Sequence, residues 1–133
     1  MVFEELKEFQ KDKKKLVKKY RSIPDDLETV KQVLEVIPNE RSPFSFRINN
    51  LGIETCIIKV KKIACKALKG KGVNSGLRLV YAYFKSQIAE SESKDEEEIE
   101  KKNMNKEKIV FIELYHKSDK DNEDRERILK YFK

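Results

Sequence analysis

The feature that most constrains this chain is a cation set inside a strand-forming run, Gly76-Leu77-Arg78-Leu79-Val80-Tyr81-Ala82-Tyr83-Phe84. Branched and aromatic residues favour a strand, and the glycine before them marks a turn. A charged side chain in a sheet is costly unless a carboxylate neutralises it or an anionic ligand uses it. The sequence therefore predicts that Arg78 either pairs with a carboxylate such as Glu113 or binds an anion, for which a phosphate backbone is the simplest candidate.

Charge is distributed unevenly along the 133 residues, which carry 30 Lys and Arg against 24 Asp and Glu. Residues 87–107 hold eight acids and four bases, so the remainder holds 26 bases and 16 acids. A small body this basic favours polyanions, with nucleic acid ahead of an acidic protein partner. We interpret 87–107 as a charged insertion between the last two strands, either disordered or a solvated helix.

Apolar periodicity predicts the order of the other elements. Helices are expected at 7–20, at 22–37 and, at the end of the chain, at 121–132, and strands at 56–68, 77–84 and 108–115. Residues 2–6 read as either a short strand or a lead-in to the first helix. Residues 39–52 read as loop, with a short extended piece where Phe44, Phe46 and Ile48 alternate.

This order predicts a single domain over 1–133 with an α+β fold. We expect an N-terminal helical hairpin packed on a small antiparallel twisted sheet, followed by a C-terminal helix, because successive strands lack crossover helices.

Several function classes lack their signals in the sequence. Cys56 and Cys65 form no CxxC pair, and no Cys/His cluster predicts a metal site. Gly70-Lys71-Gly72 lacks the spacing of a nucleotide-binding P-loop, so no small-molecule cofactor is expected. No signal-peptide core or membrane-spanning apolar run is present, and we expect a cytoplasmic protein without a membrane partner.

Four short motifs in a fixed order resemble the RelE/ParE superfamily of bacterial type II toxin–antitoxin toxins, including its HigB-like branch. The first is Phe9-Gln10-Lys11-Asp12-Lys13-Lys14-Lys15-Leu16, and the second is Ile58-Lys59-Val60-Lys61-Lys62. The third is Gly76-Leu77-Arg78-Leu79-Val80-Tyr81, and the fourth is Leu114-Tyr115-His116-Lys117-Ser118-Asp119-Lys120. The resemblance covers nearly the whole chain apart from the acidic insertion.

The resemblance implies a toxin that a cognate antitoxin protein silences. RelE-like members cut messenger RNA, usually on the ribosome, so the expected function is a ribosome-dependent mRNA endoribonuclease (an mRNA interferase) whose partners are mRNA and ribosomal RNA. Cleavage would proceed by metal-free attack of a 2′-hydroxyl on phosphate. Two alternatives stay open: a ParE-like inhibitor of DNA gyrase that cuts nothing, and an inactive basic binding module of the same fold.

Candidate site residues follow from the resemblance and from the chemistry. Arg78 matches the family's strand arginine and suits a phosphate, His116 can exchange a proton near neutral pH, and Lys117 can bind phosphate or protonate a leaving group. Each has a plainer alternative: a paired arginine, a half-buried histidine and a solvated lysine. The residues expected to contact RNA are Lys59, Lys61, Lys62, Lys69, Lys71 and Tyr81. By strand parity, Lys59 and Lys61 should share a face and Lys62 should point to the other.

Overall fold

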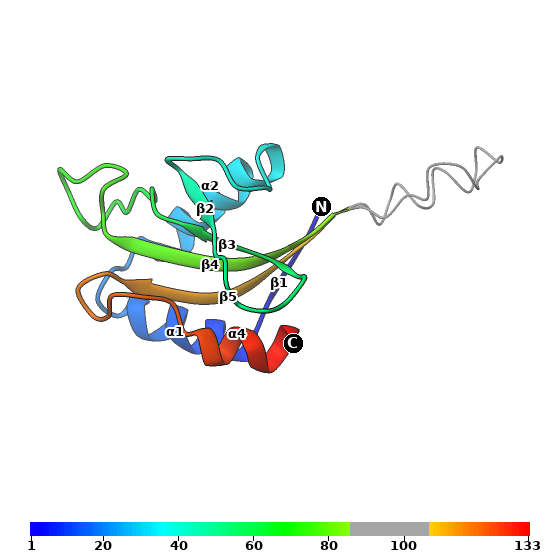
Figure 1. Cartoon of the computed structure of the whole chain (residues 1–133). Coiled ribbons are helices and arrows are strands. Elements are labelled where there is room, and N and C mark those ends of the chain that lie inside the picture. Colours follow the sequence, from blue (N-terminus) through cyan, green and yellow to red (C-terminus); the bar gives the residue numbers. More distant parts are fainter. Residues whose placement is uncertain (86–106) are drawn as a thin grey trace.

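The computed structural model describes residues 1–85 and 107–133 (Figure 1). In chain order the elements are β1 (Val2–Glu5), α1 (Lys7–Val17), α2 (Ile23–Val36), β2 (Ser45–Arg47), β3 (Cys56–Val60), β4 (Leu77–Phe84), β5 (Lys108–His116) and α4 (Arg125–Phe132). The predicted helices and the strands at 77–84 and 108–115 are confirmed within a few residues. Of the predicted strand at 56–68, only the first five residues are β3.

One sheet joins all five strands in the order β1-β5-β4-β3-β2. The pairs from β5 to β2 are antiparallel, but β1 runs parallel to β5, with Val2 opposite Lys108 and Glu5 opposite Phe111. The expected N-terminal helical hairpin on a small antiparallel sheet is therefore wrong. The fold is α+β with a mixed sheet, and its first helix follows a strand.

The physical reason for this error is that β1 has a distant partner. The side chains of residues 2–5 alternate between exposed and half-buried. Such a short pattern fits both a surface strand and a lead-in to a helix. What makes them a strand is an edge of β5, more than 100 residues later, whose backbone groups need partners. Local periodicity carries no information on such a pairing.

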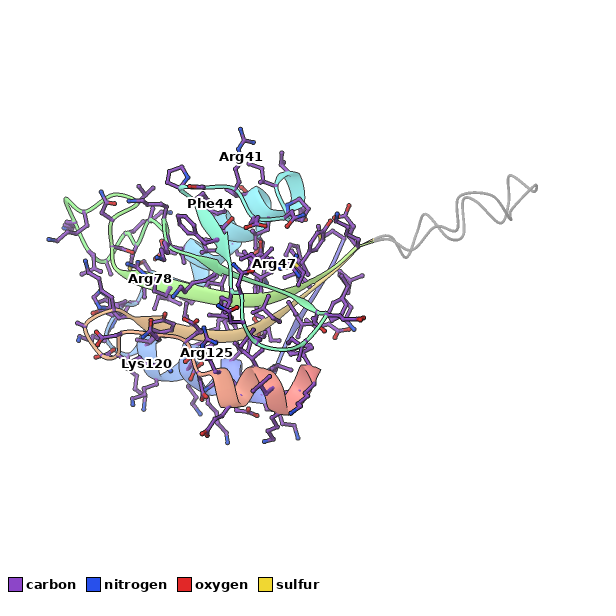
Figure 2. All side chains as sticks on the ribbon, viewed as in Figure 1. Arg41, Phe44, Arg47, Arg78, Lys120 and Arg125 are labelled. Atoms are coloured by element: carbon purple, nitrogen blue, oxygen red, sulfur yellow. The ribbon has the colours of Figure 1, made fainter. Side chains whose placement is uncertain are left out.

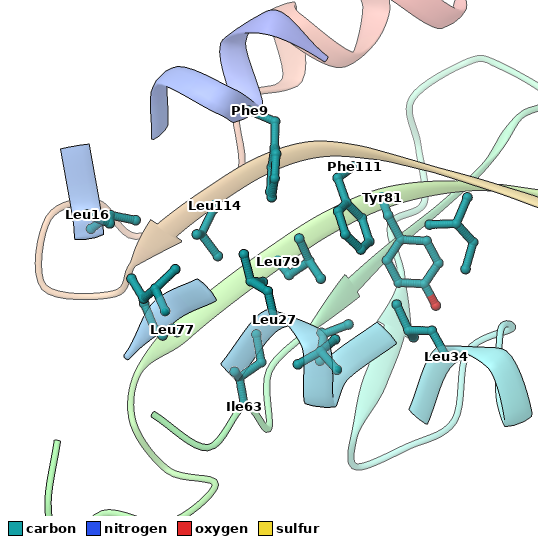
Figure 3. Close-up of a cluster of buried hydrophobic side chains, with 14 of the residues drawn as sticks. Phe9, Leu16, Leu27, Leu34, Ile63, Leu77, Leu79, Tyr81, Phe111 and Leu114 are labelled. Carbon is teal, nitrogen blue, oxygen red and sulfur yellow. The ribbon is translucent and has the colours of Figure 1, made fainter. Parts of the chain in front are cut away.

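The larger core lies between the sheet and the first two helices (Figure 3). Phe9 and Leu16 of α1 and Leu27 and Leu34 of α2 pack on the alternate residues of the strands that face them. On β4 these are Leu77, Leu79, Tyr81 and Tyr83. These residues are two apart, which is the period of a pleated strand, so Arg78 faces the other side of the sheet.

A second core covers that other side. Ile128 of α4 packs there on Ile57, Val80, Ala82, Val110 and Ile112. A register shift near Val80 interrupts the pairing of β4 with β5.

Beyond the end of β1, two charged side chains form hydrogen bonds with backbone groups of β5. Arg127 of α4 donates to the Ile112 carbonyl oxygen at 2.8 Å, and Asp12 of α1 accepts from the Leu114 N–H at 3.2 Å. Arg127 and Asp12 also bond to each other, with Nη1 and Oδ2 2.7 Å apart. This ion pair thus takes the place of the strand partner that β1 does not supply.

Most of the charged insertion expected at 87–107 lies outside the described residues, so that prediction stays untested. At its end, the Tyr83 hydroxyl donates to Glu107 at 3.2 Å. Across residues 1–85 and 107–133, no helix combines the length and the apolar character needed to cross a membrane.

Candidate functional site

Four cationic side chains meet in a groove of about 260 Å³ on the α4 side of the sheet, which we call the Arg78 groove. They are Lys61, Lys62, Arg78 and Lys117. The remaining residues that line the groove are Pro43, Phe46, Asn74 and Gly76. Of the residues that the structure describes, none with a carboxylate lines the groove, so these charges are available to an anion.

Strand pairing brings these cations together. Val60, the last residue of β3, lies opposite Leu79, so the segment that leaves β3 passes beside Arg78. The Arg78 Nη1 donates to the carbonyl oxygens of Lys61, at 3.1 Å, and Leu77, at 3.2 Å. These bonds hold the half-buried guanidinium at the groove, and its planar fork suits a phosphate.

The other two sides of the groove come from loops. Lys117 follows β5, and its N–H donates to the Gly76 carbonyl oxygen at 2.9 Å. The Lys62 ammonium donates to the Asn74 side chain at 2.7 Å. Lys62 was expected on the face away from Lys61, but β3 ends at Val60 and strand parity no longer applies beyond it.

The carboxylate considered as a partner for Arg78 is engaged elsewhere. Glu113 is 1% exposed, forms an ion pair with Lys120, and accepts from the Asp124 N–H at 2.8 Å. Glu113 thus fixes the loop between β5 and α4. The plainer interpretation, in which Glu113 neutralises Arg78, does not describe this arrangement.

His116 lies on the opposite side of the sheet from Arg78. It pairs with Leu77 in the β4–β5 register, and its ring stacks on Tyr20 with 5.6 Å between the ring centroids. Nδ1 accepts from the Ser118 N–H at 3.1 Å, so Nε2 carries the proton that is donated to the Ser75 carbonyl oxygen at 2.8 Å. Nε2 thus joins the end of β5 to the turn before β4, whereas Nδ1 bonds to the turn that follows β5.

A second hollow of about 320 Å³ adjoins the first, and we call it the Arg125 groove. Its lining consists of Phe46, Arg47, Ile48, Asn49, Asn50, Lys59, Lys61, Glu123 and Arg125. Phe46 and Lys61 line both grooves. Figure 2 labels Arg78 on β4, Arg47 at the end of β2 and Arg125 at the start of α4.

Lys59, predicted to contact RNA, forms an ion pair in the Arg125 groove. Its ammonium lies 2.9 Å from Glu123 Oε2, and the two side chains are only 13% and 7% exposed. Burial alone would raise the pKa of Glu123, but the hydrogen bond and charge of Lys59, with the charge of Arg125, outweigh it and lower that pKa. Lys59 is therefore neutralised, whereas no carboxylate of residues 1–85 and 107–133 forms an ion pair with Lys61.

The other predicted RNA contacts divide between surface and core. Lys69 and Lys71 are exposed in the turn between β3 and β4 and line neither groove. Tyr81 is fully buried, and its hydroxyl donates to the Pro38 carbonyl oxygen at 2.7 Å, so its ring cannot stack on a base. Sequence parity could have shown this, because Tyr81 and Arg78 are three residues apart in one strand.

Phe46, Asn74, Glu123 and Arg125 line the two grooves but were not predicted as site residues. Phe46 had a usable signal, since it alternates with Phe44 and Ile48 beside the lysine-rich strand. Glu123 and Arg125 had none, because their place depends on how the loop after β5 folds back over the sheet.

A larger hollow of about 460 Å³ lies between α1 and the loop after β5. Lys15 and Lys19 line it together with Asp12 and Glu113, whose carboxylates already hold Arg127 and Lys120. Its mixed charge suits a polyanion less well than the Arg78 groove does.

The cations of the Arg78 groove can therefore contact an anion and stabilise negative charge that develops on it. Over the described residues, no cluster of three or more His, Cys, Asp or Glu side chains is placed to hold a metal ion. In comparisons with known proteins, no family model, curated protein or solved structure matches this chain, and the resemblance to the RelE/ParE superfamily stays a prediction.

Proposed function

We propose that this chain binds the phosphate backbone of RNA in the Arg78 groove and acts as an mRNA-cutting toxin. One observation carries the proposal: four cations from three separate segments line one groove without a lining carboxylate in the described chain. Phosphate contacts supply most of the affinity for a nucleic acid. The cutting activity itself rests on the motif resemblance, as do the expected antitoxin and ribosome partners.

In the proposed reaction the 2′-hydroxyl oxygen attacks the adjacent phosphorus, and the bond from phosphorus to the 5′ oxygen breaks. Arg78 stabilises the negative charge that builds up on the phosphate oxygens, which its planar fork can contact in pairs. The Lys117 ammonium donates a proton to the leaving 5′ oxygen. The 2′-hydroxyl proton leaves to water, because the groove residues are cations, amides and apolar groups.

His116 has no part in the proposed reaction. Its Nε2–H is bound to the Ser75 carbonyl oxygen, and its ring stacks on Tyr20 on the opposite side of the sheet from Arg78. A groove with cations and no proton acceptor is expected to cut free RNA slowly. Efficient cutting would then require a second component such as the ribosome.

The position of His116 also favours a second candidate, a protein of the same kind that binds without cutting. A proton-exchanging histidine in the groove would count against a ParE-like inhibitor that cuts nothing, and His116 lies outside the groove. The same cations would then contact nucleic acid or an acidic surface of a target protein.

The test is expression of the chain and of matched variants in growing bacteria, with mapping of mRNA ends. The chain should arrest growth and produce defined breaks, and Arg78→Gln should lower the cleavage rate about 10²- to 10³-fold, as loss of one charge-stabilising donor does. Lys14→Gln removes the same charge from exposed α1 and should cut normally.

The outcomes separate the candidates. Growth arrest with intact messages and inhibited DNA supercoiling would replace the nuclease by a gyrase inhibitor. Folded Arg78→Gln protein that cuts at the rate of Lys14→Gln would remove the groove from the reaction.

A further inference from the structure

Two adjacent hollows with different chemistry share one aromatic wall. Phe46 and Lys61 line both the Arg78 groove and the Arg125 groove. Phe46 lies opposite Lys59 in the β2–β3 register, and its side chain is half-buried at the edge of the sheet. A ligand that fills both hollows must therefore pass over this ring.

The Arg78 groove is lined by four cations and by no carboxylate of the described residues, whereas the Arg125 groove is lined by four cations and one carboxylate, Glu123. In the Arg125 groove, Glu123 neutralises Lys59, and Arg125 lies 3.9 Å from the same carboxylate and 3.4 Å from the Asn50 carbonyl oxygen. Asn49 and Asn50 add amide groups. The Arg125 groove therefore offers hydrogen-bond acceptors as well as donors beside the Phe46 ring, and a nucleobase has both at its rim.

The Phe46 ring is occupied only weakly. The Lys61 ammonium lies 5.0 Å from the ring centroid, and an exposed cation–π contact of this kind is weaker than the stacking of a base on an aromatic side chain. A base can therefore displace the ammonium. The released Lys61 then remains within reach of the phosphate in the Arg78 groove.

We infer that the groove pair binds single-stranded RNA as a phosphate and its neighbouring base, with the base stacked on Phe46 in the Arg125 groove. This inference rests on the proposed function, because it requires RNA in the Arg78 groove. It makes Phe46, and not Tyr81, the stacking residue. It also selects unpaired RNA, since a base inside a duplex keeps both faces on its neighbours.

The test measures binding of a labelled six-nucleotide single-stranded RNA, of the same backbone with abasic ribose at every position, and of a duplex. Phe46→Ala should weaken binding of the base-bearing strand about 5- to 150-fold. It should leave the abasic strand and the duplex within about twofold, because neither offers a free base. Phe46→Tyr should bind like the parent, and Phe46→Leu, which keeps apolar bulk without a π face, should behave like Phe46→Ala.

A charge variant distinguishes loss of phosphate binding, on which the proposed function depends, from loss of base stacking. Arg78→Gln should weaken both the base-bearing and the abasic strand and reduce the salt dependence of binding, whereas Phe46→Ala should leave the salt slope unchanged. If Arg78→Gln weakens neither strand, the proposed function fails. If Arg78→Gln weakens both but Phe46→Ala changes neither, or changes both equally, the stacking inference alone is overturned.

Discussion

Replacing Gly76 with alanine tests how closely the end of β5 is held against the turn before β4. Gly76 has a φ of +91°, a region that glycine adopts and other residues avoid. A Cβ atom there would lie 2.7 Å from His116 Nε2, 2.9 Å from His116 Cε1 and 3.2 Å from Lys117 Cγ. The imidazole must then move and lose its hydrogen bond to the Ser75 carbonyl oxygen.

The expected cost has separable parts. Left-handed backbone costs an alanine about 1–2 kcal/mol, the lost hydrogen bond about 1 kcal/mol, and the displaced ring about 1 kcal/mol or more. Gly76→Ala should therefore lower the free energy of unfolding by about 3–4 kcal/mol, a large share of the ~5–15 kcal/mol of a typical domain. Gly70 is the matched control, with a φ of +80° and no atom within 4 Å of an added Cβ.

The assay is urea unfolding followed by circular dichroism. Gly70→Ala should lose only the backbone part, about 1–2 kcal/mol. In a His116→Ala background the two closest contacts are gone and only the flexible Lys117 side chain stays near the added Cβ, so Gly76→Ala should cost about as much as Gly70→Ala. Equal losses for Gly76→Ala and Gly70→Ala in the parent chain would refute the close approach of His116.

Three further predictions concern groups buried elsewhere. Arg127→Met should lower the free energy of unfolding by about 2–3 kcal/mol in urea titrations, because it leaves the Asp12 carboxylate and a β5 carbonyl without their partner; a loss below 0.5 kcal/mol would contradict this. Asp26→Ala should cost about 1–3 kcal/mol in the same assay, since that 3% exposed carboxylate accepts from the α2 N-cap hydroxyl and from a loop N–H. Burial raises the pKa of Tyr83 and of Tyr115 to about 12 each, so unfolded chains ionise first and stability should fall from about pH 10 upward. Absorbance titration of the folded protein that shows every tyrosine ionising near pH 10 would exclude this.

The elements were predictable where one local period determines them. The strand at 77–84 and the helix that buries Phe9 and Leu16 follow from alternation and from a helical apolar face. The parallel pairing of β1 with β5 was not predictable from the sequence. These four residues have a mixed pattern and form a strand only because the edge of β5, distant in the sequence, pairs with them. The mixed sheet is therefore a property of the whole chain and not of any window in it.

The residues of the candidate site also fall into a predicted group and a group that was missed. Arg78, Lys61, Lys62 and Lys117 were identified as cations near two strands, and antiparallel pairing does bring them together. Their neighbours Phe46 and Arg125 were missed because an edge strand and a returning loop position them.

The face on which His116 lies is fixed by the same pattern that forms the core. Arg78 pairs with Tyr115, so His116 pairs with Leu77 and faces the first two helices. A one-residue shift in the register of β5 would bring His116 to the side of Arg78. It would also move all the remaining side chains of β5 to the opposite face of the sheet. Leu114 would leave the core, at a cost of about 1.5–3 kcal/mol.

The same shift would carry Glu113, now paired with Lys120, into an apolar layer without its partner, which costs several kcal/mol more. No ligand contact of ordinary strength offsets that sum. The proposed reaction at the Arg78 groove therefore relies on the cations that line it, and His116 would affect that reaction only through the turn that it holds.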